Sequence, residues 1–322
     1  MHLPDAGSPS RDELEAAWCW DPDDAAPRRP AMTAFRRRAR LQQARWREKN
    51  GHPIGTQPHV PVEGRPVRLV GSRIPLPYAR ETGANLLTPG ALDAARARTS
   101  FVERHQSFDH QRLWADLLSS EALAFNLFGD AAAELRLADR AAHVLAPDMP
   151  GRVTEVRFAH SPGRLDPAWL NSLREFDVAF VLDRGDGTRG ILAVDVTYHE
   201  RLAREQPKPE NLWRVHEVAG RSGAFDAATI DAFSARSEFA VLWLEHLLLC
   251  SMLQHESGEW TWGRYLVVHP AGNPDMTDLV TRYRGRLADH TTFATMTLED
   301  LVASDALAPR SARLVRDRYL PG

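Results

Sequence analysis

Residues 175–200 read EFDVAFVLDRGDGTRGILAVDVTYHE, and this stretch decides the fold. Two apolar runs rich in β-branched and aromatic residues, 176–183 and 191–199, flank a Gly-rich segment, which is typical of two strands joined by a turn. The Asp186-Gly187 pair suits the positive backbone dihedrals of a tight turn. The sequence therefore predicts an antiparallel hairpin.

Each predicted strand carries one aspartate toward its outer end. Centring the turn on Asp186-Gly187 places Asp177 opposite residue 195 or 196, depending on whether the loop contains a bulge. Because strand side chains alternate, Asp195, Thr197 and His199 are expected to share one polar face. Asp177 and Asp195 should therefore be neighbours across the ladder.

Two adjacent carboxylates repel each other and raise each other's pKa unless a cation lies between them. Oxygen ligands without cysteine or a tight histidine cluster favour Mg²⁺ or Mn²⁺. The pair thus predicts a metal site. The alternative is that Asp177 only ends a strand and that Asp195 faces solvent.

Composition narrows the classes of protein that remain. A chain of 322 residues with 43% hydrophobic and 26% charged residues is long enough for one large or two modest domains. The net charge of -3 argues against a uniformly basic surface for nucleic acid and leaves only a local patch. The two cysteines, Cys19 and Cys250, are too few for a disulfide framework. No secretory or membrane-spanning pattern is present, so we expect a cytoplasmic protein that does not enter a membrane.

Hydrophobic periodicity divides the rest of the chain. Residues 1–33 lack sustained periodicity and predict a loosely ordered N-terminal arm, and 34–51 predict a basic helix that either covers a core edge or contacts phosphates. An extended, proline-rich segment follows, and Gly129 is expected to separate two helices. Further predicted elements are helices within 88–145, strands at 153–160 and 263–270, a buried helix at 238–255 and two short helices near the end. Helices on both sides of a central sheet make the fold α/β or α+β.

The hairpin EFDVAFVLD…GILAVDVTYHE resembles the core hairpin of PD-(D/E)XK nucleases, and in particular a bacterial restriction-endonuclease-like family. Other stretches resemble the same family in order and spacing: RARLQQARWRE, SSEALAFNLFG, SPGR, LWLEHLLLCSML and VVHPAGN, which together span about residues 34–302. The resemblance implies a restriction-endonuclease-like core, with a central mixed sheet flanked by helices. It implies one nuclease-like domain over 34–322, after the arm at 1–33.

The resemblance also implies the roles of the hairpin residues. Asp177 matches the first metal-binding acid, Asp195 matches the acid of the (D/E)XK tripeptide, and Val196 would lend its backbone carbonyl to the ion. The position of the motif lysine is occupied by Thr197. This departure removes the charge that would polarise the attacking water and stabilise the transition state.

Three replacements for the lysine are conceivable. His199 would act as a base or a metal ligand two residues further along. Lys208, in the Pro-flanked loop EQPKPEN, would swing an ammonium group toward the metal or would be an ordinary surface lysine. A second metal ion would supply the charge without any lysine.

Two further residues are candidates with a plain alternative each. Glu121 either completes the metal shell or is a first-turn glutamate favoured by the helix dipole. Arg164, in the SPGR loop, either contacts a phosphate of nucleic acid or is an ordinary loop arginine.

The sequence predicts a nuclease that hydrolyses DNA phosphodiester bonds with Mg²⁺ or Mn²⁺, and cutting both strands with one site per chain would call for a homodimer. The alternative is a catalytically inactive nuclease fold that binds nucleic acid or a protein partner.

Overall fold

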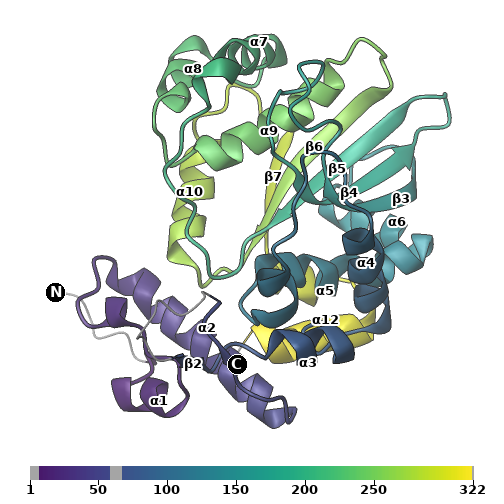
Figure 1. The fold of residues 1–322 in the computed structure, drawn as a ribbon. Helices are drawn as coiled ribbons and strands as arrows, with labels where there is room; N and C mark the ends of the chain where they lie inside the picture. The colour runs from purple at the N-terminus through teal and green to yellow at the C-terminus, as the bar shows by residue number, and fades with distance from the viewer. Residues whose placement is uncertain (1–6, 59–66, 321–322) are drawn as a thin grey trace.

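The computed structural model describes residues 7–58 and 67–320, and its centre is a five-stranded mixed sheet (Figure 1). The strand order is β3-β4-β5-β6-β7. The first three strands form an antiparallel meander, whereas β6 runs parallel to β5 and β7 runs parallel to β6. The strands are β3 (Arg152–His160), β4 (Phe176–Asp183), β5 (Arg189–Val196), β6 (Trp260–His269) and β7 (Phe293–Thr297).

Helices cover both faces of this sheet, which confirms the predicted α/β class (Figure 1). One face packs against α4 (Pro89–Ser100), α5 (Ser120–Ala133), α6 (Leu135–Leu145), α11 (Leu298–Ala303) and α12 (Pro309–Tyr319). The other packs against α7 (Leu212–Ser222), α8 (Ala227–Ser234), α9 (Ala240–Leu253) and α10 (Pro274–Arg284). Within residues 7–58 and 67–320, no helix has the length and apolar character needed to cross a membrane.

Apolar residues on both faces of the strands explain why each face of the sheet packs into a hydrophobic core. In β4, Val178, Phe180 and Leu182 join the core beneath α5, whereas Ala179 and Val181 join the core beneath α9. Asp177 lies on the same face of β4 as Ala179 and Val181, and Asp195 lies on the same face of β5 as Ala193. Both aspartates therefore lie on the α9 side of the sheet.

The N-terminal region is more ordered than its sequence predicts. Helix α1 (Arg11–Ala16) begins with a capping box between Ser10 and Glu13, and Leu14 is 0% exposed in a small apolar cluster with Leu41. The expectation of a loosely ordered arm is wrong for the described residues 7–33, because this short amphipathic piece packs on a helix that starts before residue 34. Around it lie η1 (Pro22–Asp24), α2 (Pro30–Lys49), the strands β1 (Gly55–Thr56) and β2 (Leu69–Val70), and α3 (Leu76–Thr82).

The basic helix α2 turns several arginines toward the protein. Arg40 pairs with the buried Asp24, and Arg47 donates to the carbonyl oxygens of Gly71 and His52 at 2.9 and 3.0 Å. These internal contacts favour the packing role that the sequence left open over the phosphate-binding one.

Gly129 does not end a helix, contrary to the sequence prediction. It lies inside α5, and a Cβ atom there would stand 2.3 Å from the Cα atom of Ala91 in α4. The glycine is therefore explained by the close approach of two helices rather than by a helix stop. The break falls at Glu134, between α5 and α6.

Candidate active site

Asp177 and Asp195 face each other at the end of the hairpin where β4 begins and β5 ends. The hairpin register pairs Val178 with Val194, so the next pair is Asp177 and Asp195. The backbone N–H of Asp177 donates to Asp195 Oδ1 at 3.0 Å, and the backbone N–H of Val196 donates to Asp177 Oδ2 at 2.8 Å. Each carboxylate thus accepts a backbone N–H of the neighbouring strand, which fixes both side chains beside each other.

The turn that sets this register contains the Asp186-Gly187 pair, as the sequence predicts. The N–H of Arg184 donates to Thr188 O at 3.2 Å, so three residues form the loop. Gly185 and Gly187 both have positive φ, at 80° and 84°. The register places Asp177 opposite residue 195, one of the two positions that the sequence allowed.

The two aspartates open into a cleft of about 340 Å³ beside the sheet. Five carboxyl groups and three guanidinium groups line it: Glu175, Asp177, Asp195, Glu200 and Glu245, with Arg112, Arg164 and Arg174. The cleft is therefore an acidic hollow that contains its own fixed cations.

Burial and crowding make the acidic pair costly to ionise. Burial, followed by repulsion from Asp195, raises the pKa of Asp177 well above its usual value. Burial, followed by repulsion from Glu245, does the same to Asp195. Asp195 is 9% exposed, and its Oδ2 atom makes no hydrogen bond of ordinary geometry in the described part of the chain, although the side chains of Glu245 and Tyr265 lie close enough to shift the pKa of Asp195. A bound cation would relieve both the repulsion and the missing contact.

Glu245 and Tyr265 form the floor of the site. Glu245 projects from the largely apolar helix α9, and Tyr265 Oη on β6 donates to Glu245 Oε2 at 2.9 Å. Burial raises the pKa of Glu245, and Arg174, whose Nη1 lies 3.4 Å from Glu245 Oε1, opposes that rise. Nη2 of Arg174 pairs with Glu205. Arg174 therefore neutralises the acids around it.

The acidic pair fits a divalent cation in part. Among residues 7–58 and 67–320, no group of three or more His, Cys, Asp and Glu side chains is arranged to hold a metal. Mg²⁺, however, keeps several waters and is commonly bound through one or two carboxylates plus substrate phosphates. Asp177 and Asp195, with the unpartnered Oδ2 of Asp195, meet that smaller requirement.

Strand β5 ends earlier than predicted, which moves His199 away from the aspartates. The ladder stops at Val196, although the N–H of Thr197 still donates to Val268 O at 2.9 Å. Thr197 lines the cleft, but His199 is not among its lining residues; its Nδ1 lies 3.1 Å from Leu118 O. The expectation that His199 shares a strand face with Asp195 is therefore wrong, because the chain bends after Thr197. Burial lowers the pKa of His199.

Glu121 and Lys208 have different positions relative to the cleft. Glu121 lies in the first turn of α5 near Asp177, and burial raises its pKa to about 7, with further repulsion from Glu175. Lys208 is exposed and precedes the short helix η3 (Pro209–Asn211), where it lines a neighbouring hollow instead of the cleft. Glu121 therefore acts electrostatically on Asp177 although it is not among the residues that line the cleft, and Lys208 is not brought there.

Arg164 lines the cleft but is already engaged. Its side chain is 2% exposed, it pairs with Glu103 and Glu175, and it donates to Ala159 O at 2.9 Å. A phosphate contact by Arg164 would break both ion pairs, so the structure favours a role in fixing Glu175.

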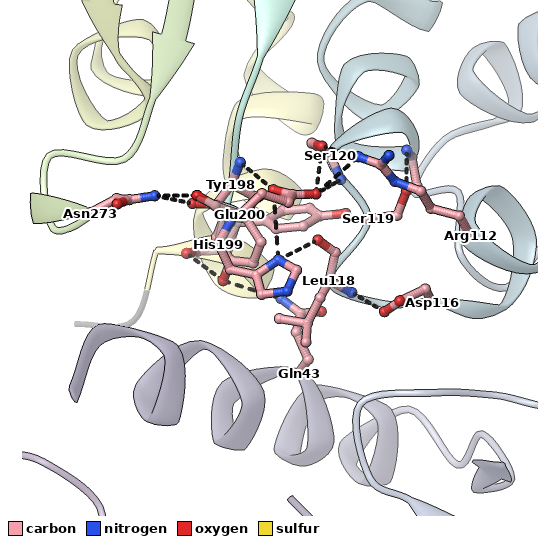
Figure 2. A network of polar contacts seen from close by, with 12 residues as sticks. Gln43, Arg112, Asp116, Leu118, Ser119, Ser120, Tyr198, His199, Glu200 and Asn273 are labelled. Atoms are coloured by element: carbon pink, nitrogen blue, oxygen red, sulfur yellow. Dashed lines mark hydrogen bonds and ion pairs between the residues drawn. The ribbon is translucent and has the colours of Figure 1, made fainter. Parts of the chain in front are cut away.

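Glu200 connects the end of the hairpin to the start of helix α5 (Figure 2). Its Oε1 accepts from Ser120 Oγ at 2.7 Å and from Arg112 Nη2 at 3.1 Å. Its Oε2 accepts from the backbone N–H groups of Tyr198 and His199, both at 3.1 Å. Burial acts to raise the pKa of Glu200, but His199, Arg112 and Ser120 outweigh burial and lower it. Glu200 is therefore an ionised anchor for Arg112.

Sequence reasoning missed Arg112, Glu200 and Glu245. Glu245 left a signal, since a carboxylate in a long, largely apolar and buried helix needs a buried partner. Arg112 left none: it lies in η2 (Gln111–Ala115), a π-helical turn that no apolar periodicity marks.

Comparison with known proteins identifies one related group. The family model described as "PD-(D/E)XK nuclease superfamily" matches residues 30–321. No curated protein and no solved structure matches the chain.

Proposed function

The chain belongs to the PD-(D/E)XK nuclease superfamily, and from this premise we propose that it is a divalent-metal-dependent nuclease that hydrolyses phosphodiester bonds of DNA. The observation that carries the proposal is the pairing of Asp177 and Asp195, cross-bonded on adjacent strands and open to one cleft.

The residues of the chain divide the work in this proposal. Asp177 and Asp195 would hold Mg²⁺ or Mn²⁺, together with the carbonyl of Val196, and the charge of Glu121 would act on Asp177 from outside the cleft lining. When bound, the cation would supply Lewis-acid polarisation of the phosphate and the attacking water. The water oxygen forms a bond to phosphorus and gives up a proton, while the bond to the leaving oxygen breaks and that oxygen gains a proton.

A catalytically inactive nuclease fold remains the second candidate function, and one observation favours it. Thr197 occupies the lysine position and lines the cleft, while His199 and Lys208 are not among the cleft-lining residues. In that case the acidic cleft would bind nucleic acid or a partner without cutting.

A cleavage assay separates the two functions. Plasmid and single-stranded DNA are incubated with Mg²⁺ and with Mn²⁺, and wild type is compared with Asp177→Asn, Asp195→Asn and Thr197→Lys. Asp183→Asn is the matched control, since Asp183 ends the same strand as Asp177 but is exposed at the far end. We expect wild type and the control to cut and the two active-site variants to lose about 100-fold or more in rate. Cutting that survives Asp195→Asn would falsify the proposed site, and cutting only by Thr197→Lys would establish the inactive fold.

A further inference from the structure

The three arginines of the cleft differ in how much of each remains available to a ligand. The side chain of Arg164 is 2% exposed between two glutamates, and that of Arg174 is 23% exposed between two others. The side chain of Arg112 is 47% exposed and has one glutamate partner, Glu200. Arg112 is therefore the arginine of this set best placed to meet an incoming anion.

The hydrogen bonds of Arg112 leave most of its fork unused. Both side-chain bonds that the structure gives it, to Ser120 Oγ at 2.9 Å and to Glu200 Oε1 at 3.1 Å, are donated by Nη2. In the described part of the chain, Nη1 and Nε make no hydrogen bond. A guanidinium held at one nitrogen presents the remaining N–H groups in a fixed fork, which matches phosphate oxygens.

Arg112 lines the same cleft as Asp177 and Asp195, and its charge and theirs act on each other. Burial lowers the pKa of Arg112, but the carboxylates of Glu200, Asp177 and Glu121 outweigh burial and raise it. Arg112 in turn opposes the rise of the Asp177 pKa. The guanidinium is thus charged, and Arg112 and Asp177 line the same cleft.

The anchor of Arg112 is rigid. Glu200 accepts bonds from the start of α5 and from the backbone after β5, as Figure 2 shows, so Arg112 is fixed to the two elements that carry Glu121 and Asp195. A positive group fixed in this way costs little reorganisation when charge develops on the substrate.

From this geometry we infer that Arg112 takes over the charge lost with the motif lysine: its free N–H groups bind a non-bridging oxygen of the scissile phosphate, and Glu200 is the residue that positions it. The inference rests on the proposed nuclease function and deepens it. It also explains how Thr197 can stand in the lysine position of an active site.

The test measures DNA binding and cleavage separately. Wild type, Arg112→Gln, Arg112→Lys and Glu200→Gln bind a short fluorescein-labelled DNA duplex in Ca²⁺ at several salt concentrations, and the same proteins are assayed for cleavage in Mn²⁺. Arg189→Gln is the matched control, because Arg189 is 48% exposed, pairs with one glutamate and lies at the other end of β5.

We expect Arg112→Gln to reduce the salt slope of duplex binding by about one, as the loss of one phosphate contact predicts. We expect it to lower kcat about 100-fold and to raise KM as well, because part of the contact is already made in the bound duplex. Arg112→Lys should recover part of both effects, and Glu200→Gln should lower kcat less than Arg112→Gln. Arg189→Gln should match wild type in every measurement.

The outcomes distinguish this inference from the proposed function. If wild type cuts and Arg112→Gln cuts equally well with an unchanged salt slope, the inference fails while the nuclease stands. If wild type does not cut but the salt slope of binding falls only in Arg112→Gln, the proposed nuclease function fails, while the contact of Arg112 with a DNA phosphate stands. Tighter Mn²⁺ binding by Arg112→Gln, with unchanged DNA affinity, would overturn the inference and show that Arg112 only neutralises the carboxylates.

Discussion

Arg318 in α12 and Asp195 in β5 are both buried charged side chains, with exposed fractions of 0% and 9%. The Arg318 guanidinium donates to Gln43 Oε1, to two oxygens of Asn85 and to Leu117 O. Its Cζ atom also lies 4.3 Å from the centroid of the Trp46 ring. Asp195 instead accepts one backbone N–H on Oδ1 and has an unpartnered Oδ2 in the described residues.

This difference in hydrogen bonding distinguishes a residue that stabilises the fold, Arg318, from a residue of the candidate site, Asp195. A buried charge without partners lowers stability, so a folded chain normally surrounds it with hydrogen-bonding groups, as it does around Arg318. In the cleft, Asp195 Oδ2 lacks a hydrogen bond of this kind among the described residues, and a bound ligand would supply the missing contact. One contact links the two regions: Asn85, which accepts from Arg318, also donates from its Nδ2 to Leu113 O at 2.6 Å. This bond holds the turn η2, which carries Arg112.

The largest expected effect tests the scaffold side of the comparison. Arg318→Met should lower the free energy of unfolding by about 3–5 kcal/mol, because it leaves several buried acceptors without donors. Urea denaturation followed by circular dichroism measures this. Arg313→Met, an exposed change on the same helix, should stay within about 0.5 kcal/mol of wild type. A loss below about 1 kcal/mol at Arg318 would mean that the network does not stabilise the fold.

The sequence predicted the parts of the site that local rules determine. Alternation and the Gly-rich turn were enough to pair Asp177 with Asp195, and apolar runs were enough to locate β3, β4 and β6. Strand β5 was extended too far, because the pattern VTYH continues to alternate after the chain has bent. Strand β7 was missed, because FATMT is short and only its first residue is buried.

The remainder of the site depends on contacts that no local pattern encodes. Arg112 reaches Glu200 across 88 positions of sequence, and Glu245 reaches Arg174 across 71. Such partners are chosen by how α5 and α9 pack on the sheet. The same holds for Gly129, whose meaning appears only when α4 lies against it.

The next effect concerns pH and tests the site side. Burial raises the pKa of Glu121 from 4.5 to about 7, so the folded protein binds this proton more tightly than the unfolded chain does. The stability that the proton confers is complete below the unfolded pKa and is lost as the pH rises through about 7. Without metal, we expect the free energy of unfolding to fall by about 2–3 kcal/mol between about pH 5 and about pH 8 on account of this group.

Glu121→Gln provides the control for that pH dependence. The variant cannot ionise at this position, so its stability should vary less with pH than that of wild type, in urea titrations with chelator present. An equal slope in both proteins would show that Glu121 is not the group responsible.

A smaller effect of opposite sign is expected at Asp195. Asp195→Asn keeps an oxygen for the N–H of Asp177 and turns an amide toward the acids around it, so it removes repulsion without opening a cavity. At about pH 8 without metal, we expect the variant to be more stable than wild type by about 1–2 kcal/mol. Added Mn²⁺ should raise the melting temperature of wild type and leave the variant unchanged. If Asp195→Asn were less stable than wild type, Asp195 would be a charge that the fold stabilises, as it stabilises Arg318.

The smallest expected effect is the coupling between the two regions. Arg318→Met and Asp195→Asn alter side chains that share no hydrogen-bond partner among the described residues, so their effects on stability should add to within about 0.5 kcal/mol. The double variant, measured by urea denaturation beside the two single ones, gives this coupling directly. A coupling above about 1 kcal/mol would show that the cleft and the Arg318 network form one cooperative unit, because independent regions do not change each other's energies. Additivity would instead mean that the repulsion in the cleft is local, so that a ligand can relieve it without rearranging the scaffold.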